Sequence, residues 1–343
     1  MRSLSQVYGL ENQFWMGGRL ATQLEEISND PSVLQDGNFW AVLVTFEGEM
    51  TFARFGQVQD SNFPESQWSE LPSPWRSSVD RDEYISYVNQ IREEIASGAV
   101  YQVNACYEFT NQLSQPIDSL SGLFSEVITK NPAPYAQYLR LPDVEIASAS
   151  PERLISRIGA QITTSPIKGT IRAEQESFGD KDKAENLMIV DLMRNDFGKI
   201  CESGSVTVSE LFRIEKHPGL SHLVSDVTGT VNTRITWAEI FAALAPAGSI
   251  SGAPKGSALR IIATHEKVMR GPYCGAIGWV QGDKAEIAVG IRTFWRTNKD
   301  VLHFGTGAGI TWSSDATAEW DETRLKADRL LSIAGGGFND NRT

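Results

Sequence analysis

The sequence predicts an α+β fold built on large antiparallel β-sheets. Strand-like segments outnumber helical ones and often follow one another directly, whereas a doubly wound parallel fold would alternate strands with helices. A hydrophobic content of 41% and a charged content of 22% are ordinary for a globular protein. The 343 residues contain no linker-like tract and no internal repeat, so we expect one large unit.

The first elements are strands, followed by one helix and a further strand. Residues 1–75 contain the strand-like run NFWAVLVTFEGEMTFARF and end in the proline-rich stretch LPSPW. From Asp80 the apolar residues recur at helical spacing, and Gly98 stands where a helix often ends in glycine. The next segment, VYQVNACYEF, alternates as a strand does, so one of its faces is available to polar groups. That face carries Gln102, Asn104 and Cys106.

The middle of the chain is expected to hold a short helix, several strands and two further helices. The short helix is SLSGLFSEVITK, and the strands after it are PYAQYLRL, VEIASAS, RLISRIG and QITTSPI. Residues 180–193 and the segment TWAEIFAAL have helical patterns, and between them lie the strands SVTVSELFRI and HLVSDVTGTV.

The last third begins with the segment APAGSISGA, which we expect to be a loop. Pro254 can open the following helix and Gly271 can close it. The strands YCGAIGWVQG and AEIAVGIRTFWR are predicted to form a hairpin around the turn at Gly282 and Asp283. A final strand, VLHFGTGAGI, precedes a helix over residues 315–333.

Charge and cysteine content limit the class of protein. A net charge of −12 argues against a nucleic-acid or anionic-membrane partner, although an anionic small molecule can still bind where cationic groups or a metal are concentrated. The three cysteines have no CxxC spacing and fit reduced, structural thiols. No apolar run has the length of a signal peptide or a membrane span. We therefore expect a soluble, cytoplasmic protein.

Two pairs of carboxylates suggest a metal site. Asp182 and Glu185 are three residues apart on one predicted helix, and Glu319 and Glu322 have the same spacing on another. Such pairs weaken an isolated helix slightly, and most of them are simply solvated. Two such helices facing each other would instead offer oxygen ligands to Mg²⁺, which binds few carboxylates and keeps water on its other positions.

An arginine and a group of glycines suggest an anion site. Strand alternation would place Arg292 on the same face as Ala288 and Gly290, which leaves space above the sheet for a planar carboxylate. The next strand ends in GTGAG, residues 305–309, whose backbone a ligand can approach closely. Each feature also has an ordinary interpretation, as an exposed arginine and as a glycine-rich turn or bulge.

Lys168 is the third candidate, in the stretch TTSPIKGTIR. A lysine between a β-branched residue and a glycine is most often a solvated strand end. Partial burial beside an accessible backbone can instead make it a nucleophile. Glu152, in the tripeptide SPE, comes just before this hairpin, and Tyr273 begins the hairpin that carries Arg292.

Taken in order, these motifs resemble the chorismate-utilising enzymes of the anthranilate synthase component I type. The matching segments lie between about residues 80 and 326: SPE, PIKGT, KDKAENLMIVDLMRND, SHLVSDVTG, PAGSISGAPK, YCGAIGW, GIRTFW and GTGAGITWSSDATAEWDET. The resemblance implies a sandwich-like sheet core flanked by helices. It also implies a chorismate-binding catalytic domain over residues 76–343, with a shortened β-rich segment, residues 1–75, packed on it. The tryptophan-binding element of feedback-inhibited relatives is not evident.

Two positions indicate which reaction of the family to expect. Members that add water to chorismate have a lysine base where this chain has Gln102, and glutamine cannot act as that base. Members that make anthranilate typically have alanine in the PIxGT motif, whereas those that make 4-amino-4-deoxychorismate have lysine. Lys168 therefore resembles the lysine nucleophile of the second group, with Glu152 as the general acid and base. Anthranilate formation remains the alternative.

The resemblance also assigns ligands and a partner. Glu185 and Glu322 would bind Mg²⁺ directly, with Asp182 and Glu319 behind them. The residues that would hold the substrate are Arg292, Tyr273, Gly307, Lys326, Thr170 and His222. None of the three cysteines lies in the glycine-flanked turn that a glutamine amidotransferase needs, so we expect ammonia from a separate amidotransferase subunit.

Overall fold

The computed structural model describes residues 12–113, 117–172, 178–217, 220–297 and 300–338. The strands are β1 (Gln13–Met16), β2 (Arg19–Ser28), β3 (Phe39–Val44), β4 (Met50–Asp60), β5 (Arg76–Ser77), β6 (Gln102–Gln112), β7 (Tyr135–Leu141), β8 (Val144–Ser150), β9 (Arg153–Ile158), β10 (Gln161–Ser165), β11 (Ile167–Arg172), β12 (Thr207–His217), β13 (Leu220–Thr230), β14 (Gly252–Ala253), β15 (Ala276–Gln281), β16 (Lys284–Val289), β17 (Thr293–Arg296) and β18 (Val301–Ile310). The helices are η1 (Pro31–Gln35), α2 (Arg81–Ala96), α3 (Ser121–Lys130), α4 (Asp180–Phe197), α5 (Trp237–Leu244), α6 (Gly248–Ser251), α7 (Lys255–His265) and α8 (Ala316–Ala334).

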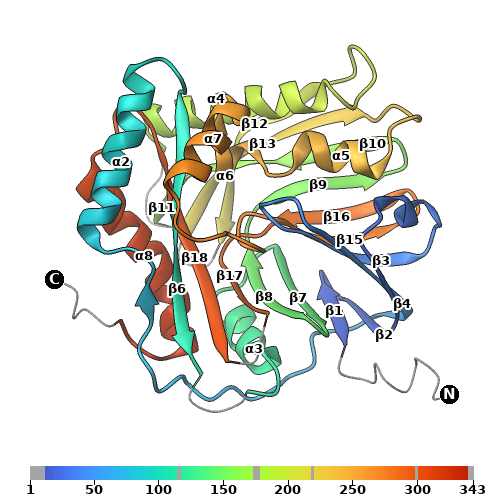
Figure 1. Ribbon diagram of the computed structural model, residues 1–343. Helices are drawn as coiled ribbons and strands as arrows, with labels where there is room; N and C mark the ends of the chain where they lie inside the picture. Colours follow the sequence, from blue (N-terminus) through green and yellow to red (C-terminus); the bar gives the residue numbers. More distant parts are fainter. Residues whose placement is uncertain (1–11, 114–116, 173–177, 218–219, 298–299, 339–343) are drawn as a thin grey trace.

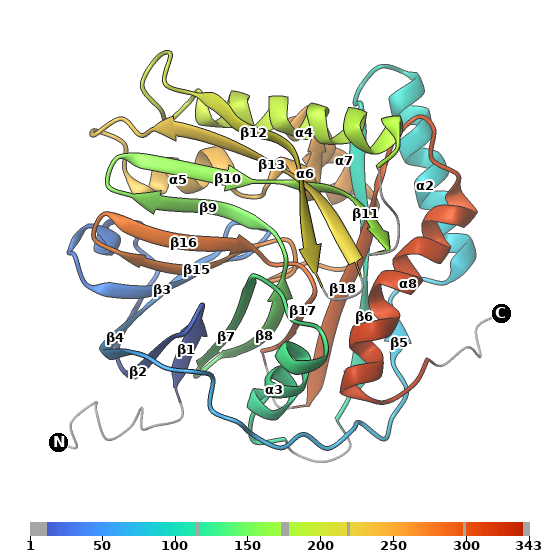
Figure 2. The same ribbon diagram turned by 180° about the vertical axis from the view of Figure 1, so that it is seen from behind.

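All the strands join one curled sheet, and the pairings between named strands of the described part are antiparallel. From one end the neighbours run β5, β6, β18, β17, β8, β7, β1, β2, β4, β3, β15, β16, β9, β10, β13 and β12. β11 continues the line of β10 along β13, and β14 pairs with the start of β6. The sheet curls strongly. As a result β11, which lies near one end of the strand order, comes close to β6 and β18, which lie near the other end (Figures 1 and 2).

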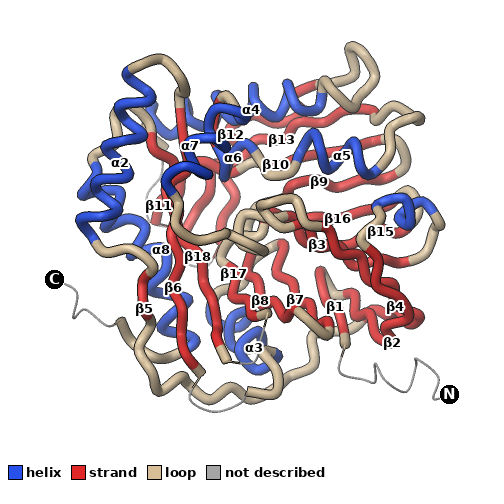
Figure 3. The backbone as a smooth tube through the Cα atoms, viewed as in Figure 1, coloured by secondary structure: helices blue, strands red, loops and turns tan. Residues whose placement is uncertain are grey.

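Helices cover two sides of this sheet. Figure 3 shows α2 and α8 along one side of the molecule and α4 and α5 along the top.

Local sequence explains where α2 and α8 begin. Asp80 and Glu83 form a capping box at the start of α2, each side chain accepting from the backbone N–H of the other at 2.9 Å. Asp315 caps α8 in the same position by accepting from the Ala318 N–H.

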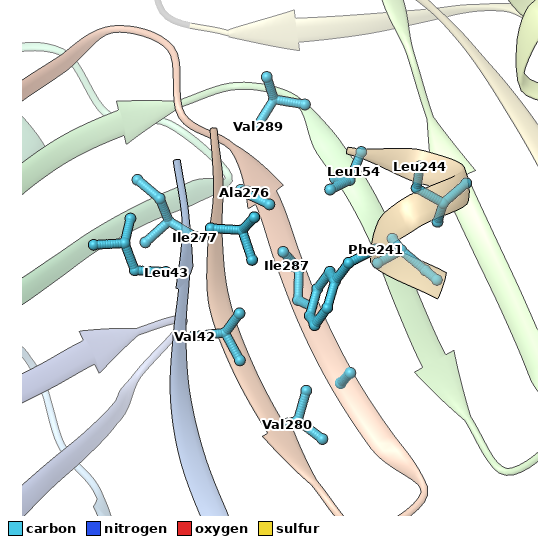
Figure 4. Close-up of a cluster of buried hydrophobic side chains, with 14 of the residues drawn as sticks. Val42, Leu43, Leu154, Phe241, Leu244, Ala276, Ile277, Val280, Ile287 and Val289 are labelled. Carbon is cyan, nitrogen blue, oxygen red and sulfur yellow. The ribbon is translucent and has the colours of Figure 1, made fainter. Parts of the chain in front are cut away.

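Two apolar cores hold the curled sheet to its helices. One lies under α4 and α5, between them and the strands around β3, β15 and β16. Figure 4 shows part of it, where Phe241 and Leu244 of α5 face Leu154, Val280 and Ile287 of the sheet. The other core lies between α2, α3, α7 and α8 and the strands β6, β17 and β18. Each large side chain buried in this way stabilises the fold by about 1.5–3 kcal/mol.

The α+β prediction, with its antiparallel sheet, is confirmed, and the hairpin around Gly282 and Asp283 is formed by β15 and β16. The sandwich arrangement and the division at residue 75 stay predictions. The described part of the N-terminal segment joins the same sheet, because β1 pairs with β7 and β3 pairs with β15. All three cysteines are free thiols, as expected.

Three local expectations were wrong. The segment after α5 is not only a loop, because it contains α6 and β14. α7 ends at His265, well before Gly271, because the chain turns away to form the segment that leads to β15. The strand carrying Arg292 is broken after Val289: β16 pairs with β9 and β15, whereas β17 pairs with β8 and β18. Arg292 lies in this break with a φ of 53°, so alternation along one strand does not set its direction.

Candidate active site

The polar face predicted on β6 and the glycines of β18 form one surface. In the antiparallel register Gly307 lies opposite Cys106, and Gly309 lies opposite Asn104. A Cβ on Gly309 would lie 2.7 Å from the Gln102 amide nitrogen and 3.3 Å from the Lys168 ammonium nitrogen. Glycine is therefore needed here, because any side chain would displace Gln102 or Lys168.

A bulge in β11 places Lys168 against this surface. Ile167 pairs with Val224 and Thr170 with His222, so three steps along β11 correspond to two along β13. The extra residue bends the strand and redirects the side chains around it. Gly169, just after Lys168, has a φ of +88°, which glycine adopts without strain. The Lys-Gly pair of the PIKGT motif is thus explained by the local backbone.

Ser249 of α6 connects Lys168 to Glu152. Its hydroxyl donates to Glu152 Oε1 at 2.6 Å, and its backbone carbonyl accepts from Lys168 Nζ at 3.3 Å. Glu152 is buried, with 5% of its surface exposed, and also accepts from the Ile167 N–H. The predicted nucleophile and the predicted acid therefore share one connecting residue.

Burial shifts both groups toward their neutral forms. Loss of water raises the pKa of Glu152 to about 7, although the Ser249 hydroxyl and the charge of Lys168 act in the opposite direction. Loss of water also lowers the pKa of Lys168, opposed by the carboxylates of Glu185 and Glu152. A carboxyl group that is partly protonated near neutral pH and an amine that deprotonates readily are the states needed for acid–base and nucleophilic chemistry.

The predicted metal carboxylates approach the same place from two helices. Glu185 of α4 and Glu322 of α8 both lie near enough to Lys168 to raise its pKa. Asp182 packs beside Gly169, since a Cβ on that glycine would lie 3.1 Å from the Asp182 Cβ, and its carboxylate accepts from the Gly179 N–H. Glu319 is buried, with 8% of its surface exposed.

These residues fit Mg²⁺ only as an open site. Within the described residues, no group of three or more His, Cys, Asp or Glu side chains is arranged to hold a metal. Two carboxylates converge beside Lys168, and Mg²⁺ commonly uses one or two carboxylates together with water and substrate oxygens. Glu185 and Glu322 are the residues that would hold it.

Lys326 and Gly307 lie at the same edge of the site. Lys326 Nζ is 2.7 Å from Glu322 Oε1, one turn away on α8, and 3.5 Å from the Gly307 carbonyl oxygen. Tyr273 is also on the glycine surface, because a Cβ on Gly305 would lie 2.2 Å from its ring. Its hydroxyl oxygen accepts from the Cys106 thiol at 3.8 Å, and burial raises the pKa of Tyr273 well above the usual value.

The structure gives less direct evidence for the other three predicted substrate residues, which are Arg292, His222 and Thr170. In the described residues Arg292 has no ion pair; burial and the nearby Arg329 lower its pKa to about 10. A half-buried cation without a carboxylate suits an anionic ligand, although Arg292 is not among the groups that contact Lys168. His222 is buried in β13, opposite Thr170. The Thr170 side chain lies outside the described part of the structure.

Sequence reasoning missed Ser249 and undervalued Gln102. Ser249 lies in the motif PAGSISGAPK, but its neighbours suggest only a flexible loop, and nothing in that string indicates a contact with Glu152. Gln102 is 1% exposed, and neither end of its amide has a hydrogen-bond partner among the described residues. A buried amide without a partner normally costs free energy, so Gln102 is a position that needs an explanation.

Comparison with known proteins identifies the class. The family model for chorismate binding enzymes matches residues 34–332, and the chain belongs to this family. Aminodeoxychorismate synthase component 1 of Klebsiella aerogenes is 37% identical over 293 residues, which are 81% of this chain and 64% of that protein. Anthranilate synthase component 1 of Saccharolobus solfataricus is 37% identical over 270 residues, which are 75% of this chain and 63% of that protein. The chain thus spans slightly less than two thirds of each.

A solved structure supports the fold. MenF, the menaquinone-specific isochorismate synthase of Escherichia coli, matches with a TM-score of 0.80 at 17% identity, over 97% of this chain and 91% of that one. No helix of the described residues is long and apolar enough to span a membrane.

Proposed function

We propose that this protein is an aminodeoxychorismate synthase component I. It converts chorismate and ammonia to 4-amino-4-deoxychorismate and water, a step toward 4-aminobenzoate and folate. The observation that carries the proposal is the half-buried Lys168, held beside Glu152 by Ser249 at the position where relatives that make anthranilate typically have alanine. The family resemblance and the relatives named above support the same reaction.

The first step is a displacement by Lys168. Its neutral amine attacks ring carbon C2, both ring double bonds shift by one position around the ring, and the hydroxyl on C4 leaves with a proton from Glu152 as water. Burial favours the neutral amine and the protonated carboxyl together, and both forms are needed. The lysine nitrogen then loses a proton and remains as a secondary amine on the ring.

The second step restores the lysine. Ammonia adds to C4, both double bonds shift back, and the bond between C2 and the Lys168 nitrogen breaks. The departing amine takes up a proton, and the added nitrogen loses one, which Glu152, joined to Lys168 through Ser249, can exchange. In total one hydroxyl is replaced by one amino group, and no oxidant or reductant is consumed.

Charged and backbone groups around Lys168 would hold the substrate. Mg²⁺, when bound by Glu185 and Glu322, would supply positive charge to one substrate carboxylate. Arg292 and Lys326 are cations suited to carboxylates, and Tyr273, Gly307, Thr170 and His222 complete the set assigned by the resemblance. Asp182 and Glu319 would stand behind the two metal ligands.

Gln102 argues against the addition of water. Its amide lies beside Lys168 and Gly309, the region in which the attacking nucleophile must enter. A glutamine has no basic site at neutral pH, so it cannot remove a proton from water. Ammonia needs no such base, because neutral ammonia is a much stronger nucleophile than neutral water and attacks without first losing a proton. We further propose that a separate glutamine amidotransferase subunit supplies the ammonia.

Anthranilate synthase component I is the second candidate, favoured by the similar identity of relatives with that name. The assay contains chorismate, Mg²⁺ and ammonium, with and without an added lyase that releases 4-aminobenzoate. We expect 4-aminobenzoate only with the lyase and no fluorescent product without it. Anthranilate fluoresces without any second enzyme, so its appearance would reject the main proposal and support the alternative.

A further inference from the structure

Arg270 is a buried arginine outside the residues that the proposed reaction uses. It lies between α7 and β15, with 4% of its surface exposed. Its Nε and Nη2 donate to the two oxygens of Glu266 at 2.8 and 2.6 Å. Nη1 donates to the Ile250 carbonyl at 2.9 Å, and Nη2 also donates to the Asn104 carbonyl at 2.7 Å. One guanidinium therefore joins α7, α6 and β6.

The two backbone carbonyls belong to segments that carry site residues. Ile250 follows Ser249, whose hydroxyl and carbonyl contact Glu152 and Lys168. Asn104 is two residues from Gln102 and on the same face of β6. α6 is a single short turn, so its own hydrogen bonds give it little rigidity. The hydrogen bond from Arg270 to the Ile250 carbonyl supplies the rigidity that this short turn lacks.

Arg270 is itself held from several sides. Glu266 Oε1 also accepts from the Cys106 N–H at 3.0 Å and from the Tyr87 hydroxyl at 3.3 Å. The Glu47 carboxylate accepts from the Arg270 N–H at 2.7 Å, and the guanidinium lies 4.2 Å from the centre of the Phe46 ring. Together these contacts fix the guanidinium in one orientation.

Stability alone does not account for this arrangement. Replacing a buried ion pair by apolar side chains of similar size is often neutral or stabilising, because burying two charges is costly. What an apolar pair cannot do is direct hydrogen bonds at two carbonyls in different segments. The planar fork of arginine does this, and the single ammonium of lysine cannot reach all of the same acceptors.

We propose that Arg270 is a positioning residue that holds α6, and with it Ser249, in register with Lys168 and Glu152. This inference rests on the proposed function for the roles of those two residues. Arg270 touches no reacting atom and acts through Ser249.

The matched control is Arg296 of β17, also buried and also paired with a glutamate. It donates to Glu145 at 2.8 Å through Nε and to the carbonyls of Ile117 and Asp118, which precede α3. Arg296→Lys therefore removes the same kinds of contact, to a glutamate and to two backbone carbonyls, from an equally buried arginine that lies away from α6. We expect Arg270→Lys to lower kcat about 100-fold with little change in KM, as misplacement of a catalytic group does, and Arg296→Lys to leave both nearly unchanged.

Amide hydrogen exchange tests the same idea without any reaction. The N–H groups of Ile250 and Ser251 donate to the Ala247 carbonyl. In Arg270→Lys the peptide containing residues 247–252 should exchange faster, because α6 opens locally, whereas in Arg296→Lys it should not. If the wild-type chain made anthranilate, the proposed function would fail while this measurement still decided the role of Arg270.

A double-mutant cycle with Ser249→Ala tests whether the effect passes through Ser249. We expect Arg270→Lys to cost less kcat in the Ser249→Ala background than in the wild type, because the hydroxyl that it positions against Glu152 is already gone and only the backbone contact to Lys168 remains. Additive losses, or a loss in Arg270→Lys no larger than in Arg296→Lys, would overturn the proposal. If Arg270→Lys fails to fold, Glu266→Gln loosens the same guanidinium while keeping one acceptor, and the same comparisons apply.

Discussion

Among the individual residues, Lys168 carries the most specific expectation. In the proposed reaction it would be made reactive by a bulge that turns it onto the glycine surface and by burial that favours its neutral amine. The simplest alternative is that Lys168 is only a positive charge that attracts the substrate. The two possibilities differ in whether a bond forms.

With chorismate and Mg²⁺ but no ammonia, we expect a ring adduct on Lys168, measured as added mass on the peptide containing PIKGT. Lys168→Ala should remove the adduct and most 4-aminobenzoate formation, by far more than the roughly 2–3 kcal/mol expected from losing one charge-assisted hydrogen bond. Arginine is too basic to offer a neutral nitrogen, so an active Lys168→Arg variant would count against covalent catalysis.

The Ser249 hydroxyl should control the pH at which Glu152 works as an acid. Adduct formation needs protonated Glu152, so its rate should fall as the pH rises through about 7, the pKa of that group. The hydroxyl donates to the ionised carboxylate and so lowers this pKa. In Ser249→Ala the pKa rises, and the alkaline fall should move to higher pH by about one unit.

The rate of adduct formation against pH measures this, without interference from the ionisation of ammonium. Ser148→Ala is the control, because Ser148 is equally buried but bonds to Thr293 Oγ1 at 2.8 Å. A fall at the same pH in both variants would show that Ser249 does not tune Glu152.

Among the secondary-structure elements, α4 and α8 matter most to the site, because each brings one carboxylate toward Lys168. We expect Glu185→Gln and Glu322→Gln each to abolish turnover and leave the fold intact, since each removes a metal ligand and not a core contact. Asp191→Asn is the control on α4, because the one ion pair of Asp191 in the described part of the chain is with Arg194 on an exposed surface. Near wild-type activity of either glutamine variant at limiting Mg²⁺ would reject the assignment.

The sequence predicts such elements better than the contacts between them. Periodicity and caps located α2 and the hairpin of β15 and β16, because these depend on neighbouring residues. The break in the strand at Arg292 was missed. It follows Gly290, which lies against Pro272 so closely that a Cβ there would be 2.2 Å from the Pro272 carbonyl oxygen. Only the tertiary structure shows this contact. Lys168 and Glu152 were found through motifs, whereas Ser249 and Arg270 make contacts that join segments 20 or more residues apart and leave no local signal.

For the molecule as a whole, the curled sheet explains how distant segments make one site. β6 and β18 lie near one end of the strand order and β11 near the other, yet Lys168 and Gly309 are in contact. Along β18, the pairing with β17 covers only Phe304 and His303 among the described residues, so the edge beyond Gly305 is open where Lys326 reaches Gly307. The proposed reaction would therefore take place at a sheet edge between two helices.

The proposed reaction uses ammonia, and none of the three cysteines is suited to releasing ammonia from glutamine. Cys106 and Cys274 are buried, and burial raises the pKa of Cys106 well above its usual value, which opposes formation of a reactive thiolate. Burial also raises the pKa of the half-buried Cys201, to about 11. A glutaminase needs an activated cysteine, so none of the three is a candidate.

We therefore expect the purified chain to form 4-amino-4-deoxychorismate with ammonium and to be inert with glutamine. Its rate with ammonium should rise with pH in proportion to the fraction present as NH₃, up to the pH at which Glu152 loses its proton. The measurement is coupled formation of 4-aminobenzoate at a fixed total ammonium concentration, with glutamine alone in a parallel reaction. Adding a glutamine amidotransferase subunit should restore activity with glutamine and leave the ammonium reaction in place, because the two chemistries lie on separate chains. Product from glutamine and the pure chain would mean that a glutaminase site lies within this molecule, and the inference of a separate partner would be wrong.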